Sequence, residues 1–418
     1  MKLSKLAEGI RTSEIIQLAA EINEKIHLGE QFYNLTIGDF NPEIFAIPVE
    51  YQDEIIAAYK AGHTNYPGAV GVPILREAIA RFLQNREELQ YSPGEILISS
   101  GARPLIYASY RTVVDRGDRV IFPTPSWNND HYCKLLDADA VVLETLPENN
   151  FMPTAAELEP QVRKASLIAL CSPLNPTGTA FSKSGLEEIC ELVLHENRRR
   201  GAHEKPLYMI YDQIYWLITF GETRHYNPVS LRPELRPYTI FIDGMSKAFA
   251  ATGVRVGWAF APREILGKMK SILAHMGAWA PKSEQVATGN FLRQDAALDK
   301  YLNNFRKAVQ LRLQGFYIGF MSLREKGFNV NAIEPQAAIY LTVQVELRGK
   351  STPSGELLST NLDVHRYILE EARIGLVPFS FFGASKESSW YRLSVGTCRL
   401  EEVEQIMSNL EQALGKLS

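Results

Sequence analysis

The sequence of 418 residues predicts an α/β protein built on a mainly parallel sheet. Apolar runs of strand length alternate with amphipathic stretches of helical period along most of the chain. Small, polar or charged residues directly follow these runs, at the sheet edge where open α/β sheets bind their ligands. The chain is also longer than a single hydrophobic core usually supports, so we expect two domains.

Six apolar runs are expected to form strands of this sheet, and they cover 95–99, 120–122, 167–171, 207–211, 238–242 and 256–260. Helical patterns lie between them, for example over 104–114 and 184–197. The basic run Arg198, Arg199 and Arg200 precedes Gly201 at the end of the second helical pattern. We expect a basic helix end with a glycine stop, which adds a little macrodipole stabilisation and nothing more.

Composition and charge exclude several classes of protein. Of the residues, 45% are apolar and 22% are charged, as in ordinary globular proteins, and the net charge of -4 leaves no basic footprint for nucleic acid or an anionic membrane. No apolar segment has the length of a membrane span or a signal core. Cys133, Cys171, Cys190 and Cys398 lack paired or metal-like spacing, which predicts no disulfide, no metal site and a cytoplasmic location.

The lysine after the fifth strand is the strongest pointer to function. Ser246 and Lys247 follow the run 238–242, and Arg255 comes eight positions after the lysine. A lysine in this setting can form an imine with an aldehyde, while the hydroxyl and the arginine hold a phosphate. The alternative is a solvent-exposed lysine in a polar loop, which is the usual place for a lysine.

Two other strand ends carry weaker signals. Gly101, Ala102 and Arg103 open a helix after the first strand, where free backbone N–H groups can bind an anion such as phosphate, or the segment is a plain helix cap. Trp127 follows the second strand and offers a flat ring for stacking on a planar cofactor. Its alternative is a packing residue of the core or rim.

The third and fourth strands end in polar residues as well. Asn175 lies among two prolines and a glycine in a turn that can aim its amide into a cleft, and the alternative is an ordinary loop. Asp212 and Tyr215 follow the fourth strand within one short turn. A buried aspartate needs a cationic or hydrogen-bonded partner, and a protonated pyridine nitrogen would be such a partner.

Together these motifs resemble the class I and II aminotransferases, pyridoxal-phosphate enzymes of fold type I, and in particular the bacterial aspartate aminotransferases. The resemblance spans most of the chain. It implies that Lys247 is the Schiff-base lysine and that Asp212 binds the pyridine nitrogen of pyridoxal 5'-phosphate. It further implies that Tyr215 and Asn175 bind the ring hydroxyl and that Trp127 stacks on the ring.

The resemblance also implies a phosphate site, formed by Gly101, Ala102, Arg103, Ser246 and Arg255. The early segment around Tyr66 resembles the family segment whose tyrosine reaches the phosphate of the neighbouring subunit. A homodimer with shared active sites is therefore expected, with no nucleic acid or membrane as a partner.

The substrate contacts implied by the resemblance come from both ends of the chain. Arg392, on a run that reads as a strand, would grip the substrate α-carboxylate with its planar fork, and the backbone of Gly38 would touch the same group. From the sequence alone, without the resemblance, Arg392 is interpreted as a surface strand residue. Arg103 falls at the position where one bacterial branch of aspartate aminotransferases has a lysine that binds the distal carboxylate of the substrate, and it could bind the same group. The alternative is that Arg103 pairs with an acidic neighbour and does not contact the substrate. Trp127 and Asn175 are expected to contact the substrate too.

The resemblance implies a large cofactor-binding domain over 47–304 with a mainly parallel seven-stranded sheet, and a smaller α+β domain from 1–46 and 305–418. The implied reaction moves an amino group from an L-amino acid, with aspartate as the first choice, to 2-oxoglutarate by a ping-pong mechanism. Alternatives are a donor such as an aromatic amino acid, another pyridoxal-phosphate reaction such as C–S β-lysis, and a non-enzymatic cofactor-dependent sensor.

Some positions depart from the family pattern. No proline stands two residues after Gly38, and the turn at 336–338 lacks its family glycine. A late loop carries Phe379, Phe381 and Phe382 around the place of another glycine. We expect these rings to crowd or reshape the mouth of the site, so the identity of the substrate depends on them.

Overall fold

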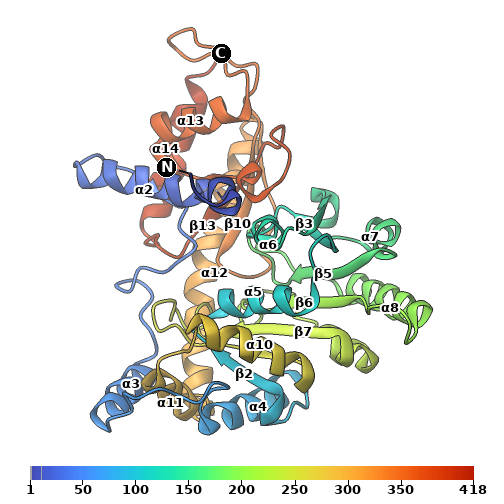
Figure 1. Cartoon of the computed structure of the whole chain (residues 1–418). Helices are drawn as coiled ribbons and strands as arrows, with labels where there is room; N and C mark the ends of the chain where they lie inside the picture. Colours follow the sequence, from blue (N-terminus) through green and yellow to red (C-terminus); the bar gives the residue numbers. More distant parts are fainter. Residues whose placement is uncertain (1, 11) are drawn as a thin grey trace.

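The computed structural model describes residues 2–10 and 12–418 and contains a seven-stranded sheet with helices on both faces (Figure 1). The strand order is β2-β8-β7-β6-β5-β3-β4. Strand β8 is antiparallel to both of its neighbours, and all other pairs are parallel. The seven strands are β2 (Ile96–Ser99), β3 (Arg119–Thr124), β4 (Asp139–Glu144), β5 (Ala165–Cys171), β6 (Tyr208–Asp212), β7 (Thr239–Gly244) and β8 (Gly257–Phe260).

The predicted mainly parallel α/β sheet is confirmed, and each of the six predicted strands matches an observed strand to within about two residues at either end. Strand β4 was not predicted from the sequence. It lies at the edge of the sheet, and its residues are exposed or half-buried, so it lacks the continuous apolar run of the inner strands.

Nine helices of the described chain surround this sheet: α3 (Val49–Lys60), α4 (Pro73–Glu87), α5 (Ala102–Val113), α6 (Asn129–Leu136), α7 (Ala155–Val162), α8 (Lys183–Arg200), α9 (Pro228–Leu231), α10 (Arg263–Met276) and α11 (Lys282–Phe291). Short 3-10 turns cover Pro93–Glu95, Pro147–Asn149 and Pro233–Tyr238. Successive residues of a strand point to opposite faces, so Ile210 and Ile240 pack in one core cluster, while Met209 and Phe241 pack in the other. Both faces of the sheet are therefore buried.

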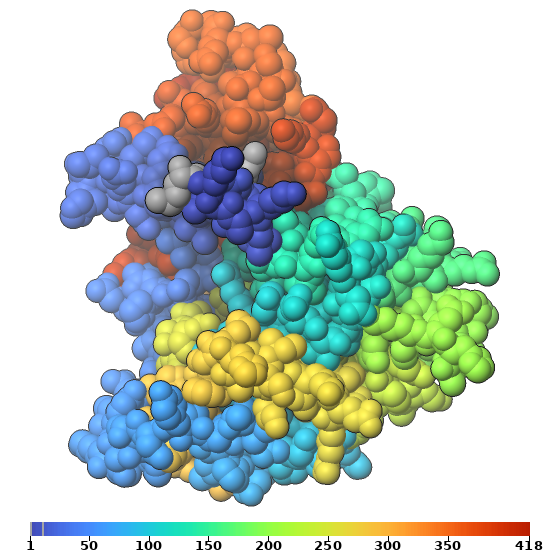
Figure 2. Space-filling model, in the orientation of Figure 1, coloured from blue at the N-terminus to red at the C-terminus, as the bar shows by residue number. Residues whose placement is uncertain are grey.

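A second, antiparallel sheet has the order β12-β13-β10-β9, and a two-stranded parallel ribbon joins β1 to β11. Figure 2 shows the blue N-terminal residues lying against the orange C-terminal part, in agreement with this ribbon. The elements of this region are α1 (Lys5–Gly9), α2 (Glu14–His27), β1 (Tyr33–Asn34), α12 (Asp295–Glu325), β9 (Val330–Ala332), β10 (Tyr340–Val345), α13 (Asn361–Ala372), β11 (Ile374–Gly375), β12 (Val377–Pro378), the 3-10 turn Phe379–Phe382, β13 (Trp390–Ser394) and α14 (Glu402–Gly415).

Helix α12 runs between the two sheets as one uninterrupted helix of 31 residues (Figure 1). Its inward stripe of apolar residues recurs every three or four positions, from Leu298 to Leu323. The domain boundary expected at 304 falls inside this helix. Among the described residues, no helix has the length and apolar character needed to cross a membrane.

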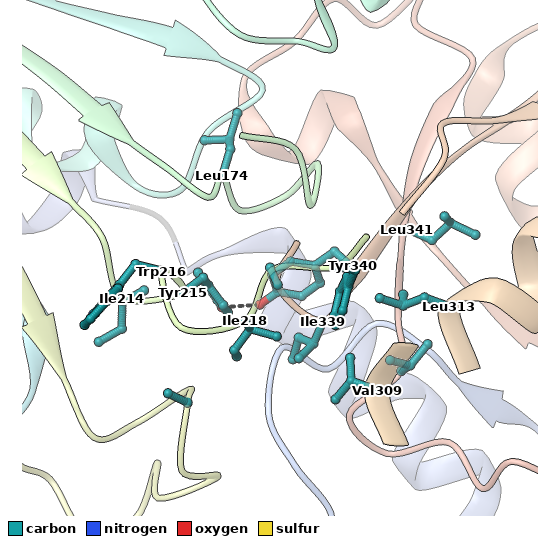
Figure 3. Packing of buried hydrophobic residues seen from close by; sticks show 14 of the residues in the cluster. Leu174, Ile214, Tyr215, Trp216, Ile218, Val309, Leu313, Ile339, Tyr340 and Leu341 are labelled. Carbon is teal, nitrogen blue, oxygen red and sulfur yellow. Dashed lines mark hydrogen bonds between the residues drawn. The ribbon is translucent and has the colours of Figure 1, made fainter. Parts of the chain in front are cut away.

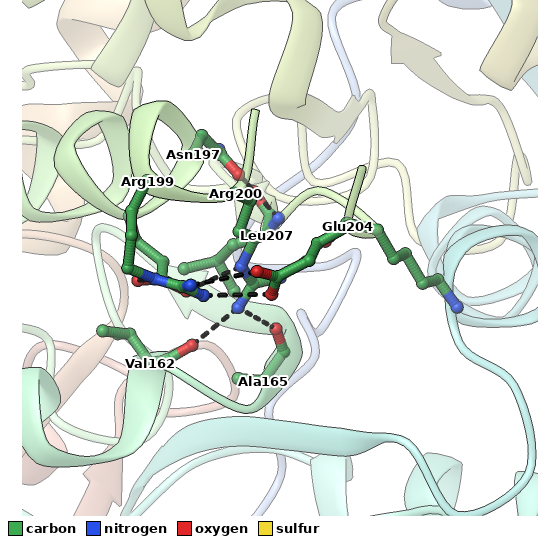
Figure 4. Close-up of polar contacts among 9 residues, drawn as sticks. Val162, Ala165, Asn197, Arg199, Arg200, Glu204 and Leu207 are labelled. Atoms are coloured by element: carbon green, nitrogen blue, oxygen red, sulfur yellow. Dashed lines mark hydrogen bonds and ion pairs between the residues drawn. The ribbon is translucent and has the colours of Figure 1, made fainter. Parts of the chain in front are cut away.

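The end of α8 differs from the sequence prediction. Arg200 is only 6% exposed, and its Nε donates to Oε1 of Glu196 at 2.7 Å. Its terminal nitrogens donate to the carbonyl oxygens of Val162 and Ala165 at 2.8 Å each, and to that of Lys205 (Figure 4). The prediction of a helix end with only a macrodipole effect is therefore wrong for Arg200, which ties α8 to the start of β5.

Replacing Arg200 is expected to destabilise the fold strongly. Arg200→Ala would remove one of the two arginines that bind the buried carboxylate of Glu196, together with the hydrogen bonds to three carbonyl oxygens. The expected cost is about 3 kcal/mol or more in the free energy of unfolding. Arg198→Ala is the matched control, because the Arg198 side chain is 69% exposed and stands 3.7 Å from Glu191. Its expected cost is below about 0.5 kcal/mol. Urea unfolding measures both, and equal losses would contradict a special role for Arg200.

Candidate active site

A cavity of about 820 Å³ lies between the carboxyl ends of the parallel strands and the second sheet. Residues singled out from the sequence line it together: Gly38, Ala102, Arg103, Trp127, Asn175, Asp212, Tyr215, Ser246, Lys247, Arg255 and Arg392. Gly101 lies directly before Ala102, as the N-cap of α5. The loops that follow the strands of one sheet thus converge on one cavity, as expected for an open α/β sheet.

Lys247 follows β7 and is half-buried in this cavity. Its Nζ donates to the carbonyl oxygen of Gly38 at 2.6 Å. Burial lowers the pKa of the lysine to about 8, Asp39 opposes this shift, and Arg392 with other nearby arginines reinforces it. About a tenth of the amine is therefore uncharged at pH 7, far more than for an ordinary lysine, and this form can act as a nucleophile or a base.

Asp212 ends β6 and presents a carboxyl group to the cavity. One of its oxygens accepts a hydrogen bond from the backbone N–H of Ile214 at 3.1 Å. Burial raises its pKa to about 6, while the Ile214 N–H and the charge of Lys247 act in the opposite direction. No lysine, arginine or histidine in the described part of the chain stands within ion-pair distance of it, so the carboxylate can still pair with a cationic ligand.

The start of α5 and Arg255 form the anion-binding end of the cavity. Gly101 has a φ of 95°, and a Cβ at this position would stand 2.3 Å from Nη2 of Arg255. The guanidinium is held by the carbonyl oxygens of Thr252 and Ser100 at 2.8 and 2.9 Å. Among the residues that the structure describes, no side chain caps α5, so its first N–H groups and the guanidinium can meet one anion such as a phosphate.

Arg392 lies on β13 and is 1% exposed, so the interpretation as a surface strand residue is wrong. Its Nη1 donates to Oδ1 of Asn175 at 2.9 Å, and Nη2 donates to the carbonyl oxygen of Thr36. The rings of Tyr340 and Phe382 lie 4.7 and 4.8 Å from its guanidinium carbon. Its buried Nε lacks an acceptor among the described residues, so an anionic ligand would complete its hydrogen bonds.

Arg103 is exposed at the cavity wall, and its guanidinium carbon lies 5.2 Å from the ring centre of Trp127. Over residues 2–10 and 12–418, no acidic side chain forms an ion pair with it. The acidic neighbour considered from the sequence is therefore not observed. Trp127 also packs against Phe382, with the ring centres 6.0 Å apart. It therefore belongs both to the cavity wall and to a small apolar cluster.

Tyr66, which is predicted to reach the cofactor phosphate of a neighbouring subunit, does not line the cavity of its own chain. Its side chain is 82% exposed and packs edge-on against Trp279, with the ring centres 5.4 Å apart. The position leaves its hydroxyl group free to contact another molecule.

Several residues of the cavity wall were missed by the sequence reasoning. Thr252 donates to Oδ1 of Asp39 at 2.6 Å, and Ile214 and Tyr340 line the cavity beside Asp212 and Arg392. Ile214 was open to prediction, because it lies between the two polar residues of the turn after β6. Helix α2 contributes an apolar wall of Ile15, Ile16, Ala19 and Ala20, and its amphipathic pattern gave no sign of which surface it covers.

These groups fit pyridoxal 5'-phosphate. Arg255 and the start of α5 suit its phosphate, and the unpaired carboxyl of Asp212 suits its pyridine nitrogen. The amine of Lys247, with its lowered pKa, suits its aldehyde. Trp127 and Ile214 provide flat and apolar surfaces for the ring.

Comparisons with known proteins agree with this geometry. The chain is 29% identical over 392 residues to the aspartate aminotransferase of Geobacillus stearothermophilus, covering 92% of each chain. It is 28% identical to a probable aspartate/prephenate aminotransferase of Rickettsia felis, covering 92% and 90%. The crystal structure of the aspartate aminotransferase from Rhizobium meliloti superposes over 100% of both chains, with a TM-score of 0.89 and 26% identity. The family model for aminotransferase class I and II matches residues 30–410, and the chain belongs to this family.

Proposed function

We propose that this aminotransferase takes aspartate as its preferred amino donor and 2-oxoglutarate as its acceptor, in a ping-pong reaction. Membership of the family makes the protein a transaminase that depends on pyridoxal 5'-phosphate. The choice of aspartate rests on Arg103, a cation at the cavity wall that has no acidic partner in the described chain. Aspartate aminotransferases among its relatives support the same choice.

Bound pyridoxal 5'-phosphate supplies an aldehyde that reacts with amines and a protonated ring that withdraws electrons from the substrate. In our proposal Asp212 keeps the ring nitrogen protonated, and Tyr215 and Asn175 contact the ring hydroxyl. Trp127 stacks on the ring. The phosphate is held by Arg255, Ser246 and the backbone of Gly101, Ala102 and Arg103.

Lys247 would carry out the proton transfers. Its Nζ would accept a proton from Cα of the substrate and return a proton on the product side, while the bound cofactor would supply the electron-withdrawing ring. Its pKa of about 8 supports this role, because such a group can both accept and return a proton near neutral pH. The carbonyl of Gly38 lies within hydrogen-bond distance of Nζ and would orient it.

Arg392 and Gly38 would fix the substrate α-carboxylate. The guanidinium is held rigidly by Asn175, Thr36 and two aromatic rings, so little entropy is lost when a carboxylate binds to it. Its free Nε supports the proposal that an anion binds there.

Arg103→Gln is expected to lower kcat/KM for aspartate by about 10–150-fold, because a charge-assisted hydrogen bond contributes about 1.5–3 kcal/mol. The value for alanine, which lacks a distal carboxylate, should stay within about twofold of wild type. Arg111→Gln is the matched control, since Arg111 is exposed near the other end of α5 and outside the cavity. Steady-state kinetics with both donors measure these effects. Equal losses for aspartate and alanine would contradict the proposed contact.

A second candidate donor is an amino acid with an aromatic or aliphatic side chain. The apolar wall of α2, with Ile15, Ile16 and Ala19, faces the same cavity and favours such a side chain. This candidate replaces aspartate if kcat/KM is higher for phenylalanine than for aspartate and if Arg103→Gln leaves kcat/KM for both of these donors unchanged.

We also propose a homodimer in which Tyr66 contacts the phosphate bound by the partner subunit, which its exposed position supports. Residues 47–304 would form the large domain, and 1–46 with 305–418 the small domain, with α12 as the connecting helix. Four free cysteines support a location in a reducing cytoplasm.

A further inference from the structure

A pair of buried tyrosine hydroxyls joins the two halves of the cavity. Tyr215 follows β6, Tyr340 begins β10 of the second sheet, and their Oη atoms are 2.6 Å apart (Figure 3). Both side chains are at most 2% exposed, and their rings meet edge to face with centres 5.6 Å apart. Among the described residues each hydroxyl has only the other as a hydrogen-bond partner.

Tyr340 also contacts the groups that surround Arg392. Tyr340 lies on β10, which pairs with β13, and the centre of its ring is 4.7 Å from the guanidinium carbon of Arg392. A Cβ added to Gly38 would stand 2.7 Å from Oη of Tyr340 and 3.5 Å from Nη1 of Arg392. The hydroxyl of Tyr340 therefore lies between the backbone of Gly38, the guanidinium and Tyr215.

The charge distribution decides which hydroxyl donates. Burial raises the pKa of both phenols, but the guanidinium of Arg392 and the bond to Tyr215 act against this shift at Tyr340. The pKa of Tyr215 is raised well above its usual value by burial and further by its contact with Tyr340, and Arg392 opposes this only in part. Either oxygen can donate in this pair, and the guanidinium beside the ring of Tyr340 favours Tyr340 as the donor because it makes that hydroxyl the stronger acid. With Tyr215 as the acceptor, its own proton is free to point into the cavity.

We propose that Tyr340 is a positioning residue of the transamination site: its hydroxyl donates to Tyr215 and so fixes Tyr215 as a donor to the ring oxygen of the cofactor, while its ring supports Arg392. The inference rests on the proposed function, because it assigns a task within the same site. It links the side chain that holds the substrate carboxylate to the side chain that contacts the cofactor.

Tyr340→Phe tests the hydroxyl without removing the ring. A donor to the ring oxygen withdraws negative charge from it, so a weaker donor leaves more negative charge beside the nitrogen of Lys247 and favours its protonation. The pH midpoint of the visible absorption change of the holoenzyme is expected to rise by about 0.3 units. Tyr215→Phe, which removes the donor itself, should shift it upward by about one unit or more.

Tyr391→Phe is the matched control, because Tyr391 is buried on β13 beside Arg392 and its hydroxyl donates to the carbonyl of Asn361, outside the cavity. Its pH midpoint should equal that of wild type. Urea unfolding of the three cofactor-free variants shows whether each is folded and provides a readout independent of turnover.

Tyr340→Leu tests the support of Arg392. Without the ring beneath its guanidinium, the arginine is held less firmly, so KM for the amino donor should rise about tenfold or more. Tyr340→Phe keeps the ring and should leave KM within about twofold of wild type while it changes kcat. A purely structural role would instead lower stability in both variants without a split between KM and kcat.

The outcomes separate the inference from the function on which it rests. A wild-type protein without a visible cofactor band or without transamination overturns both. A wild type that titrates normally, with a Tyr340→Phe curve that superposes on it while Tyr215→Phe is shifted, overturns the role of Tyr340 alone. A shift in Tyr340→Phe that Tyr391→Phe does not share supports the inference.

Discussion

Lys247→Ala is expected to lower kcat for transamination by at least about 10⁴-fold, because one side chain would supply both the covalent attachment and the proton transfers. The lysine lies at the end of β7, with Nζ bound to the carbonyl of Gly38 at 2.6 Å. The substitution removes one amine from a cavity wall and no packing contact of a core cluster, so the fold should persist. A coupled assay of oxo-acid formation from aspartate measures the loss.

Two further measurements distinguish loss of chemistry from loss of cofactor binding. After borohydride reduction, wild-type protein should gain the mass of a phosphopyridoxyl group at Lys247, and the variant should gain none. Lys247→Arg keeps the positive charge but should be as inactive as Lys247→Ala, because a guanidinium stays protonated and cannot act as a nucleophile or base. Lys268→Ala, at an exposed position of α10, is the control and should match wild type.

Retention of more than a few per cent of activity in Lys247→Ala would contradict the assignment of this lysine. Reduction that labels another lysine in wild type would do the same. A visible band that bleaches with aspartate in wild type and recovers with 2-oxoglutarate would support the reaction as a whole.

The residues that follow strands could be predicted from the sequence because position along the chain and position in the site coincide there. Parallel strands bring their carboxyl ends to one edge of the sheet, so the sequence alone predicts that Asn175, Asp212 and Lys247 lie close together. The strand register confirms that the ends of β5, β6 and β7 are neighbours, because Cys171 pairs with Asp212 and Asp212 pairs with Ile242.

The second sheet could not be predicted in the same way. Antiparallel pairing sets Thr342 opposite Arg392, and a slip by one residue would turn the arginine out of the cavity. Nothing in the local sequence fixes this register, so the contact of Tyr340 with Arg392 and Tyr215 was missed. The apolar wall of α2 was missed because an amphipathic pattern shows that a face is buried but not what it covers.

The aromatic residues of the late loop have a more definite role than was expected. Phe382 lies over the guanidinium of Arg392 and against Trp127, while Phe379 is fully buried against Phe151. Phe382 therefore contributes to the support of the arginine and shapes the cavity wall at the same time. The turn at 336–338 is tied to the loop between β5 and α8 by Gln336, whose side-chain oxygen accepts from the N–H of Ala180 at 3.1 Å.

Asp212→Asn is expected to weaken binding of pyridoxal 5'-phosphate and to lower kcat, each by about 10²–10⁴-fold, since removing one partner of a buried ion pair costs about 3–5 kcal/mol. An amide has nearly the shape of the carboxyl group but cannot balance a cationic ring nitrogen. Fluorescence titration of cofactor-free protein measures the affinity, and steady-state kinetics measure the rate. Asp130→Asn, on an exposed side chain of α6, is the control and should change neither.

The pH dependence of cofactor binding tests the same residue in a second way. Burial raises the pKa of Asp212 to about 6, so the carboxylate that pairs with a cation is present above this pH and is lost as the pH falls through it. Wild-type affinity should therefore drop about tenfold for each pH unit below about 6. The Asn variant has no such group and should lack this drop. Ionisation of the free cofactor is common to both proteins and cancels in their ratio, so a constant ratio from pH 5 to 8 would show that Asp212 does not pair with the ring nitrogen.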